Sequence, residues 1–107
     1  MRFLGFILAT LLLSSSIGHA ETCYMEVDDQ IIIEGQCTFI PTGGGSFRIL
    51  DNPDAPLYFA YVIVDRGTAI GYWNEVAGAS HAHSDLGALV RFGGCWINDT
   101  VRVCAWK

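Results

Sequence analysis

The chain has 107 residues, of which 51% are hydrophobic, and its formal net charge is −5 at pH 7. Its six basic residues form no cluster that would neutralise a row of phosphates, so nucleic acids are excluded as partners, and anionic membrane surfaces are disfavoured for the same reason. The length suits one small domain with a modest core.

The first twenty residues have the features of a cleaved secretory signal. A basic residue precedes the apolar run Phe3–Leu13, and small residues end the segment at Ala20. The run is shorter than the roughly 20 residues that cross a bilayer. We therefore expect cleavage after Ala20, no membrane contact afterwards, and a single domain over residues 21–107 of a secreted or periplasmic protein.

Removal of that signal makes the protein more acidic. Five basic and eleven acidic residues remain, which gives a net charge of −6. An acidic surface is compatible with a basic protein or a neutral sugar as the partner, and it also favours solubility.

Short strand signals and turn signals alternate along the first two thirds of the domain. We expect strands over residues 23–27, 31–40, 47–50, 57–65 and 68–74, because these stretches are rich in β-branched and aromatic residues. The intervening stretches contain the glycine, proline and aspartate that turns require.

The C-terminal third reads as a meander. Residues 88–92, 95–97 and 100–106 have strand composition, with a tight turn at Gly93-Gly94 and a second turn at Asn98-Asp99. About eight short strands at this spacing predict an all-β domain, either a small antiparallel barrel or a sandwich.

An even number of cysteines in an exported chain predicts disulfides. All four cysteines follow the signal, so we expect two bridges that hold the small fold together. The cysteines are Cys23, Cys37, Cys95 and Cys104. We favour the local pairs, in which Cys23–Cys37 closes the first hairpin and Cys95–Cys104 closes the last.

The second local pair depends on the turn between its strands. A two-residue turn at positions 98 and 99 places Cys95 opposite Arg102, whereas a four-residue loop over 98–101 places it opposite Cys104. The alternative is a bridge from the first strand to the last, such as Cys23–Cys104.

The longest stretch without a strand signal, residues 75–85, contains both histidines of the mature chain. If its second half is extended, His81, His83 and Asp85 fall on one side of the backbone. Two imidazoles and a carboxylate can bind a divalent metal, and Glu75 would add a fourth ligand.

Two other conformations remove this metal site. Apolar residues recur at helical spacing from Val76 to Leu89, and on a helix His81 and His83 would point apart. Glycines and serines weaken that helix. We therefore predict a loop with at most one helical turn, and the simplest role for its histidines is hydrogen bonding to nearby backbone.

No catalytic motif accompanies this loop. The serines, histidines and aspartate of residues 80–85 are neighbours in sequence and do not converge from separate elements. A nucleophile elbow, a zinc-protease helix and a phosphate loop are missing from the sequence. We predict a protein that is not an enzyme and has no cofactor.

Aromatic residues beside the loop suggest a contact face. Tyr72 and Trp73 are consecutive on a predicted strand, so one should face the core and the other should lie near the surface. We therefore predict a binding face for a protein or a sugar between Tyr72 and Asp85, formed by Tyr72, Trp73, His81, His83 and Asp85. Trp96 and Trp106 in the last hairpin are further candidates for stacking, although a small core should bury most of these rings.

In size, acidity, disulfide content and lack of catalytic residues, the chain is similar to small exported β-domains such as the periplasmic lysozyme inhibitors. This resemblance implies inhibition of a basic secreted enzyme. A metal-binding protein that uses His81, His83 and Asp85, and a structural or stress protein without a specific ligand, are the alternatives. Our leading hypothesis is a small exported interaction domain.

Overall fold

The computed structural model describes residues 21–52 and 54–106, so the predicted signal peptide lies outside the described residues. Within the described part, the regular structure consists of eight strands. They are β1 (Glu21–Val27), β2 (Gln30–Gly43), β3 (Ser46–Leu50), β4 (Phe59–Asp65), β5 (Thr68–Trp73), β6 (Ser84–Phe92), β7 (Cys95–Ile97) and β8 (Val101–Trp106). Across residues 21–52 and 54–106, no helix is long and apolar enough to span a membrane.

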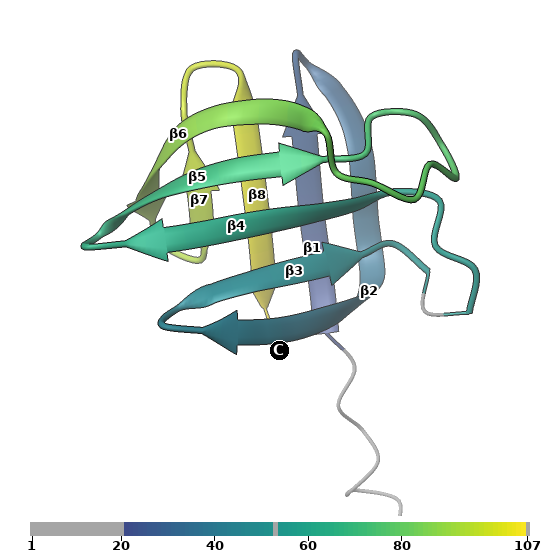
Figure 1. Cartoon of the computed structure of the whole chain (residues 1–107), viewed down its shortest axis with the longest axis horizontal. Helices are drawn as coiled ribbons and strands as arrows, with labels where there is room; N and C mark the ends of the chain where they lie inside the picture. The colour runs from purple at the N-terminus through teal and green to yellow at the C-terminus, as the bar shows by residue number, and fades with distance from the viewer. Residues whose placement is uncertain (1–20, 53, 107) are drawn as a thin grey trace, which may run out of the picture.

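The strands form a closed antiparallel barrel (Figure 1). Each strand pairs with the next one in sequence, and β8 returns to pair with β1. Closure leaves no free sheet edge. The prediction of an all-β antiparallel fold is confirmed, and of the two predicted architectures the chain adopts the barrel.

In four of the hairpins, a tight turn connects the two strands. Asp28-Asp29 and Arg66-Gly67 have positive φ at both positions, and glycines supply positive φ in the 44–45 and 93–94 turns. Positive φ at the central residues matches the right-handed twist of the strands on either side. The turn residues therefore specify where the chain reverses.

The connections alternate between the two ends of the barrel because the strands run alternately in opposite directions. We call one end the loop end; it contains the connections 28–29, 51–58, 74–83 and 98–100. The opposite end contains the turns 44–45, 66–67 and 93–94, together with the start of β1 and the end of β8.

Both disulfides are the local pairs. Cys23 bonds to Cys37 across the β1–β2 hairpin, and Cys95 bonds to Cys104 across the β7–β8 hairpin. Cys95 and Cys104 are directly opposite one another in the ladder. Two disulfides are compatible with an oxidising extracellular or periplasmic environment.

The expected two-residue turn at Asn98-Asp99 is wrong, because Ile97 pairs with Arg102 across a four-residue connection. The side chain of Asn98 explains the longer loop. Its Oδ1 accepts hydrogen bonds from the amides of Thr100 and Val101, each at 2.9 Å. Its Nδ2 donates to the carbonyl oxygens of residues 86 and 88 in β6, at 2.9 and 3.1 Å.

The long loop before β6 is shorter than predicted. β6 begins at Ser84, so Ser84 and Asp85 belong to a strand, and residues 74–83 contain no helical turn. The ladder between β5 and β6 is interrupted by a bulge, since Gly71 pairs with Gly87 but Tyr72 pairs with Asp85. The bulge lets β6 start its pairing earlier than the sequence pattern indicated.

The inside of the barrel is filled by side chains from every strand. Fully buried members include Met25, Ile49, Val62, Leu89 and Val103, each 0% exposed. Alternate residues of each strand point inward, as the period-2 patterning of the sequence predicts.

Candidate binding site at the loop end

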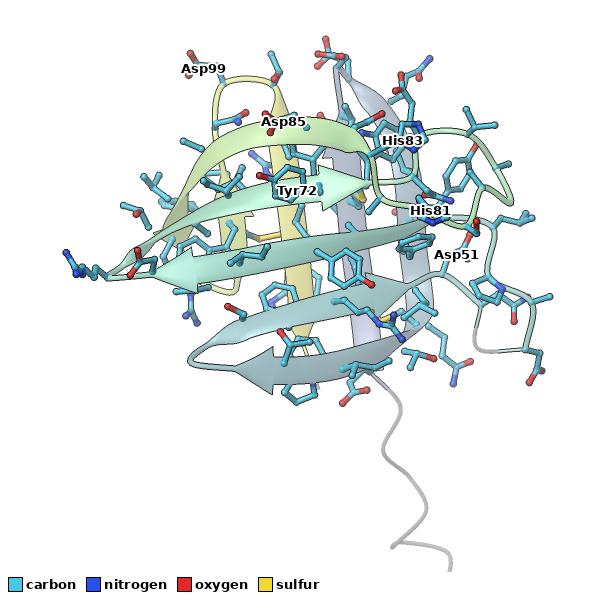
Figure 2. The ribbon with its side chains drawn as sticks, in the orientation of Figure 1. Asp51, Tyr72, His81, His83, Asp85 and Asp99 are labelled. Carbon is cyan, nitrogen blue, oxygen red and sulfur yellow. A yellow bond between two sulfur atoms is a disulfide. The ribbon has the colours of Figure 1, made fainter. Side chains whose placement is uncertain are left out.

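The structure distributes the five residues predicted for the contact face over three environments. Trp73 is 8% exposed and packs in the barrel against the ring of Tyr58, at a centroid distance of 6.1 Å. Tyr72 and Asp85 are paired neighbours on the outside of β5 and β6 (Figure 2). The two histidines are exposed in the 74–83 loop. The alternation expected for Tyr72 and Trp73 is confirmed, with Trp73 as the inner residue.

The histidines and Asp85 each make local polar contacts. His81 Nδ1 lies 3.0 Å from the hydroxyl of Ser80. His83 Nδ1 lies 3.1 Å from the backbone carbonyl of residue 81, a contact that requires the proton on Nδ1. Asp85 accepts a hydrogen bond of 2.6 Å from the amide of Gly87, which stabilises the bulge.

These contacts do not assemble a metal-binding set. Within residues 21–52 and 54–106, no three histidine, cysteine, aspartate or glutamate side chains are grouped so that they would hold one ion. His81 and His83 lie on the loop while Asp85 lies over β6 (Figure 2). The metal site therefore stays a prediction from the H-x-H spacing.

A buried amide organises the loop end. Asn74, the first residue after β5, is 0% exposed. Its Oδ1 accepts a hydrogen bond of 3.1 Å from the amide of Phe59, and its Nδ2 lies within 2.8–3.3 Å of the carbonyl oxygens of Leu57, Val76 and Ala79. One side chain thus connects the 51–58 loop to the 74–83 loop.

Backbone bonds reinforce this connection. The amide of Gly78 donates to the carbonyl of Leu57 at 2.9 Å, which is a second link between the two loops. Within the 51–58 loop, Asp51 accepts a hydrogen bond of 2.9 Å from the Leu57 amide through its side chain. The two loops are therefore held side by side in one arrangement.

Two apolar side chains are displayed by these linked loops. Leu57 is 53% exposed and Val76 is 61% exposed. Their carbonyl oxygens both contact Asn74 Nδ2, so the two residues are neighbours although they belong to different loops. Exposed apolar groups on a fixed backbone are a suitable centre for a contact surface.

The loop end is also acidic. The four connections there contain no lysine or arginine, and they carry six of the acidic residues of the domain. These are Asp28, Asp29, Asp51, Asp54, Glu75 and Asp99. Figure 2 shows Asp51 near the histidine loop and Asp99 in the 98–100 connection. The exposed histidines belong to one of these four connections.

Sequence patterns did not reveal the role of Asn74 or of Leu57. Asn74 was expected only as the last residue of a strand, and its partners are up to 17 positions away in sequence. Leu57 was expected inside a strand, but β4 begins at Phe59. The only available signal was a polar residue directly after an apolar strand, which is a weak indication of a buried amide.

A second feature that the sequence did not reveal is a pair of hollows at the opposite end. Their volumes are about 150 and 130 Å³, and both are lined by Phe39 and Ala105. The larger is also lined by Phe47, Arg91 and Trp96. These residues come from five different strands, so they meet only because the strands close into a barrel.

Of the two remaining tryptophans, Trp96 is 5% exposed and Trp106 is 45% exposed. The expectation that most of the rings are buried therefore holds for Trp73 and Trp96. Comparison with protein-family models, with curated proteins and with solved structures gave no match to this chain.

Proposed function

We propose that this chain is a small exported interaction domain, without enzymatic activity, that binds a basic protein partner through its loop end. The contact surface consists of the 51–58 and 74–83 loops, with Leu57 and Val76 at its centre and His81 and His83 beside them. It keeps the histidine loop of the predicted contact face, and it replaces Trp73 with the apolar residues that are exposed.

The observation that carries the proposal is the set of hydrogen bonds made by Asn74. A loop that must become ordered on binding loses conformational entropy, which weakens the complex. The bonds of Asn74 hold both loops in the free protein, so little of that loss remains when a partner docks.

The charge of the loop end supports a basic partner. Six carboxylates without a compensating lysine or arginine attract a positively charged surface and accelerate its approach. A basic secreted enzyme is a partner of this kind, which agrees with the resemblance of the chain to periplasmic lysozyme inhibitors in size and charge.

Affinity capture from an exported protein fraction tests this proposal. Wild-type protein should retain a basic protein, and a Leu57→Asp/Val76→Asp variant should lose it. Phe92→Asp is the matched control, because Phe92 is 69% exposed at the opposite end of the barrel. The control should retain the same protein as the wild type.

The affinity of the captured protein is then measured by isothermal titration calorimetry. Raising the salt concentration from 50 to about 300 mM should weaken binding, because exposed charges are screened. Binding that survives the Leu57→Asp/Val76→Asp change, or a captured protein that is acidic, would contradict the proposal.

A further inference from the structure

The outside of strands β3 to β6 carries a continuous row of four polar and aromatic side chains. Arg48 pairs with Tyr61, Tyr61 pairs with Tyr72, and Tyr72 pairs with Asp85. The row therefore has a cation at one end, an anion at the other, and two tyrosine rings between them. With strands about 4.8 Å apart, the two charges are separated by roughly 14 Å.

The next row of outward-facing residues along these strands, farther from the loop end, is apolar. Ile63 of β4 pairs with Ile70 of β5, and Ile70 pairs with Ala88 of β6. Ile63 is 50% exposed, Ile70 is 46% exposed, and Val90 farther along β6 is 54% exposed. We call these two rows, with Val90, the outer β3–β6 face. Exposed aliphatic groups next to the half-buried rings of Tyr61 and Tyr72 form a surface of the kind that another molecule covers.

Neither charge of the first row has an ion-pair partner among residues 21–52 and 54–106. The Arg48 guanidinium stacks over the Tyr61 ring at 5.7 Å and donates to the Tyr61 hydroxyl at 3.2 Å. Asp85 accepts from the Gly87 amide, and it is exposed beside Tyr72 on the outer side of the strands (Figure 2). The side chains of Arg48 and Asp85 are both held by neutral groups, so the charge of each is available to form an ion pair with another molecule.

We propose that the outer β3–β6 face binds a second copy of this chain. A two-fold axis that lies between the copies, parallel to the strands and midway between β4 and β5, reverses the order of each row. Arg48 of one copy then meets Asp85 of the other, twice by symmetry. Tyr61 faces Tyr72, and Ile63 faces Ile70. The face is complementary to itself in charge and in apolarity.

This inference does not rest on the loop-end proposal, because the two surfaces use different residues. The charge pairs specify both partner and register, since a shift of one strand would bring Arg48 over a tyrosine and leave Asp85 unpaired. The order of charges in the row is therefore complementary to its own two-fold copy, which favours a second copy of this chain as the partner.

Charge reversal gives a direct test by analytical ultracentrifugation. Wild-type protein should show a concentration-dependent dimer. Arg48→Glu places like charges together at two symmetric positions, and Asp85→Arg does the same, so each variant should raise the dimer dissociation constant at least about tenfold. Arg102→Glu on the outside of β8 is the control for a change in net charge, and it should dimerise as the wild type does.

Restoring complementarity is the decisive step. An equimolar mixture of the Arg48→Glu and Asp85→Arg proteins should form a heterodimer, because each reversed charge then faces an opposite one. The double variant that carries both changes should recover a homodimer. Neither recovery is expected if the single changes act by damaging the fold.

Asp85→Arg also removes the acceptor for the Gly87 amide, so Asp85→Asn is a second variant that keeps an acceptor oxygen and removes the charge. It should weaken the dimer less than Asp85→Arg and leave the melting temperature close to that of the wild type. A monomeric wild type at several hundred micromolar, single reversals without effect, or a mixture that stays monomeric would each overturn the proposal.

Discussion

The side chain of Asn74 forms hydrogen bonds with four backbone groups, and all of these groups belong to other residues of the loop end. Two of these groups belong to residues 57 and 59 and two to residues 76 and 79, so the buried amide links two separate segments. The role of Asn74 therefore depends on contacts with residues that are 15 and 17 positions away in sequence, and a local sequence pattern does not display such contacts.

Replacing Asn74 with alanine should lower the free energy of unfolding by about 1–3 kcal/mol, because the Phe59 amide and several carbonyl oxygens would lose their partner in a buried site. Urea denaturation measures this change. Asn52→Ala is the control, since Asn52 is exposed and accepts one hydrogen bond, from the Asp54 amide. Equal stability of the two variants would contradict the structural role assigned to Asn74.

Tyr24 provides a prediction about pH. Its hydroxyl donates a hydrogen bond of 2.6 Å to Glu26. That bond, with the charges of Glu26 and Glu34 nearby, raises the pKa of Tyr24 above its ordinary value of 10.0. Since the pKa is raised in the folded state, the bond stabilises the fold below pH 10.0 and this stabilisation disappears as the pH rises through the pKa of Tyr24.

Glu26→Gln removes the charge while keeping an acceptor, and it should bring the pKa of Tyr24 down toward the ordinary value. An NMR titration of the labelled tyrosine ring carbon Cζ measures this pKa. If Tyr24 titrates alike in the wild type and in the Glu26→Gln protein, the Glu26 carboxylate is not the cause of the shift.

Among the elements, the strands were predictable to the extent that they alternate and end in turn residues. The turns at Arg66-Gly67 and Gly93-Gly94 were recognised because positive φ favours glycine. The start of β6 was missed, since its first residues, Ser84 and Asp85, have loop composition. Their pairing with β5 comes from the bulge and from barrel closure, which are properties of the assembled sheet.

The four residues between the paired positions Ile97 and Arg102 show a similar limit of prediction from sequence. The sequence left two turn lengths open, and the register of Cys95 and Cys104 depended on which was used. The side chain of Asn98 decides the outcome: its Oδ1 accepts hydrogen bonds from two amides that follow it, and its Nδ2 donates to two carbonyl oxygens of the neighbouring strand β6. The spacing of the cysteines predicts what the longer loop does to the register, but the hydrogen bonds of Asn98 that stabilise this loop involve β6 and are not visible in the local sequence.

At the β5–β6 contact, Gly71 leaves room for two leucines. A Cβ atom at this position would lie 3.0 Å from Cδ1 of both Leu86 and Leu89, which are buried. Gly71→Val should therefore lower the free energy of unfolding by about 1–3 kcal/mol through overpacking. Urea denaturation provides the measurement.

Thr22→Val introduces the same side chain at an exposed position of β1 and is the matched control. It should change the free energy of unfolding by less than about 0.5 kcal/mol. A Gly71→Val protein as stable as this control would show that the leucines move aside without loss.

For the whole molecule, the fold class and the two bridges followed from general properties: short alternating segments, frequent turns and an even number of cysteines in a small chain. The contact surface did not follow from them. Leu57 and Val76 are 19 positions apart and meet only because the β3–β4 and β5–β6 connections emerge at the same end of a barrel. Closure of the barrel itself depends on β1 meeting β8, the strand pairing with the largest sequence separation within residues 21–52 and 54–106.

Reduction should destabilise the domain because a core of this size contributes little surplus stability. Loss of both bridges should lower the free energy of unfolding by about 2–5 kcal/mol. Thermal melting with and without dithiothreitol measures the difference. The Cys23→Ala/Cys37→Ala and Cys95→Ala/Cys104→Ala variants, each under oxidising conditions, separate the two contributions. Identical melting curves for oxidised and reduced wild type would contradict this expectation.

The pairing of β1 with β8 places Thr22 directly opposite Trp106, so the two ends of the folded domain are adjacent. Because the ring of strands is closed, no connection between neighbouring strands is required to hold a particular strand first in the chain. A circularly permuted chain that starts at the Gly44-Gly45 turn, with the old ends joined by a short linker, would retain all eight strand pairings and both disulfides. Because that new opening lies at the end opposite Leu57 and Val76, the order in which the strands are synthesised can be changed without touching the loops at the other end.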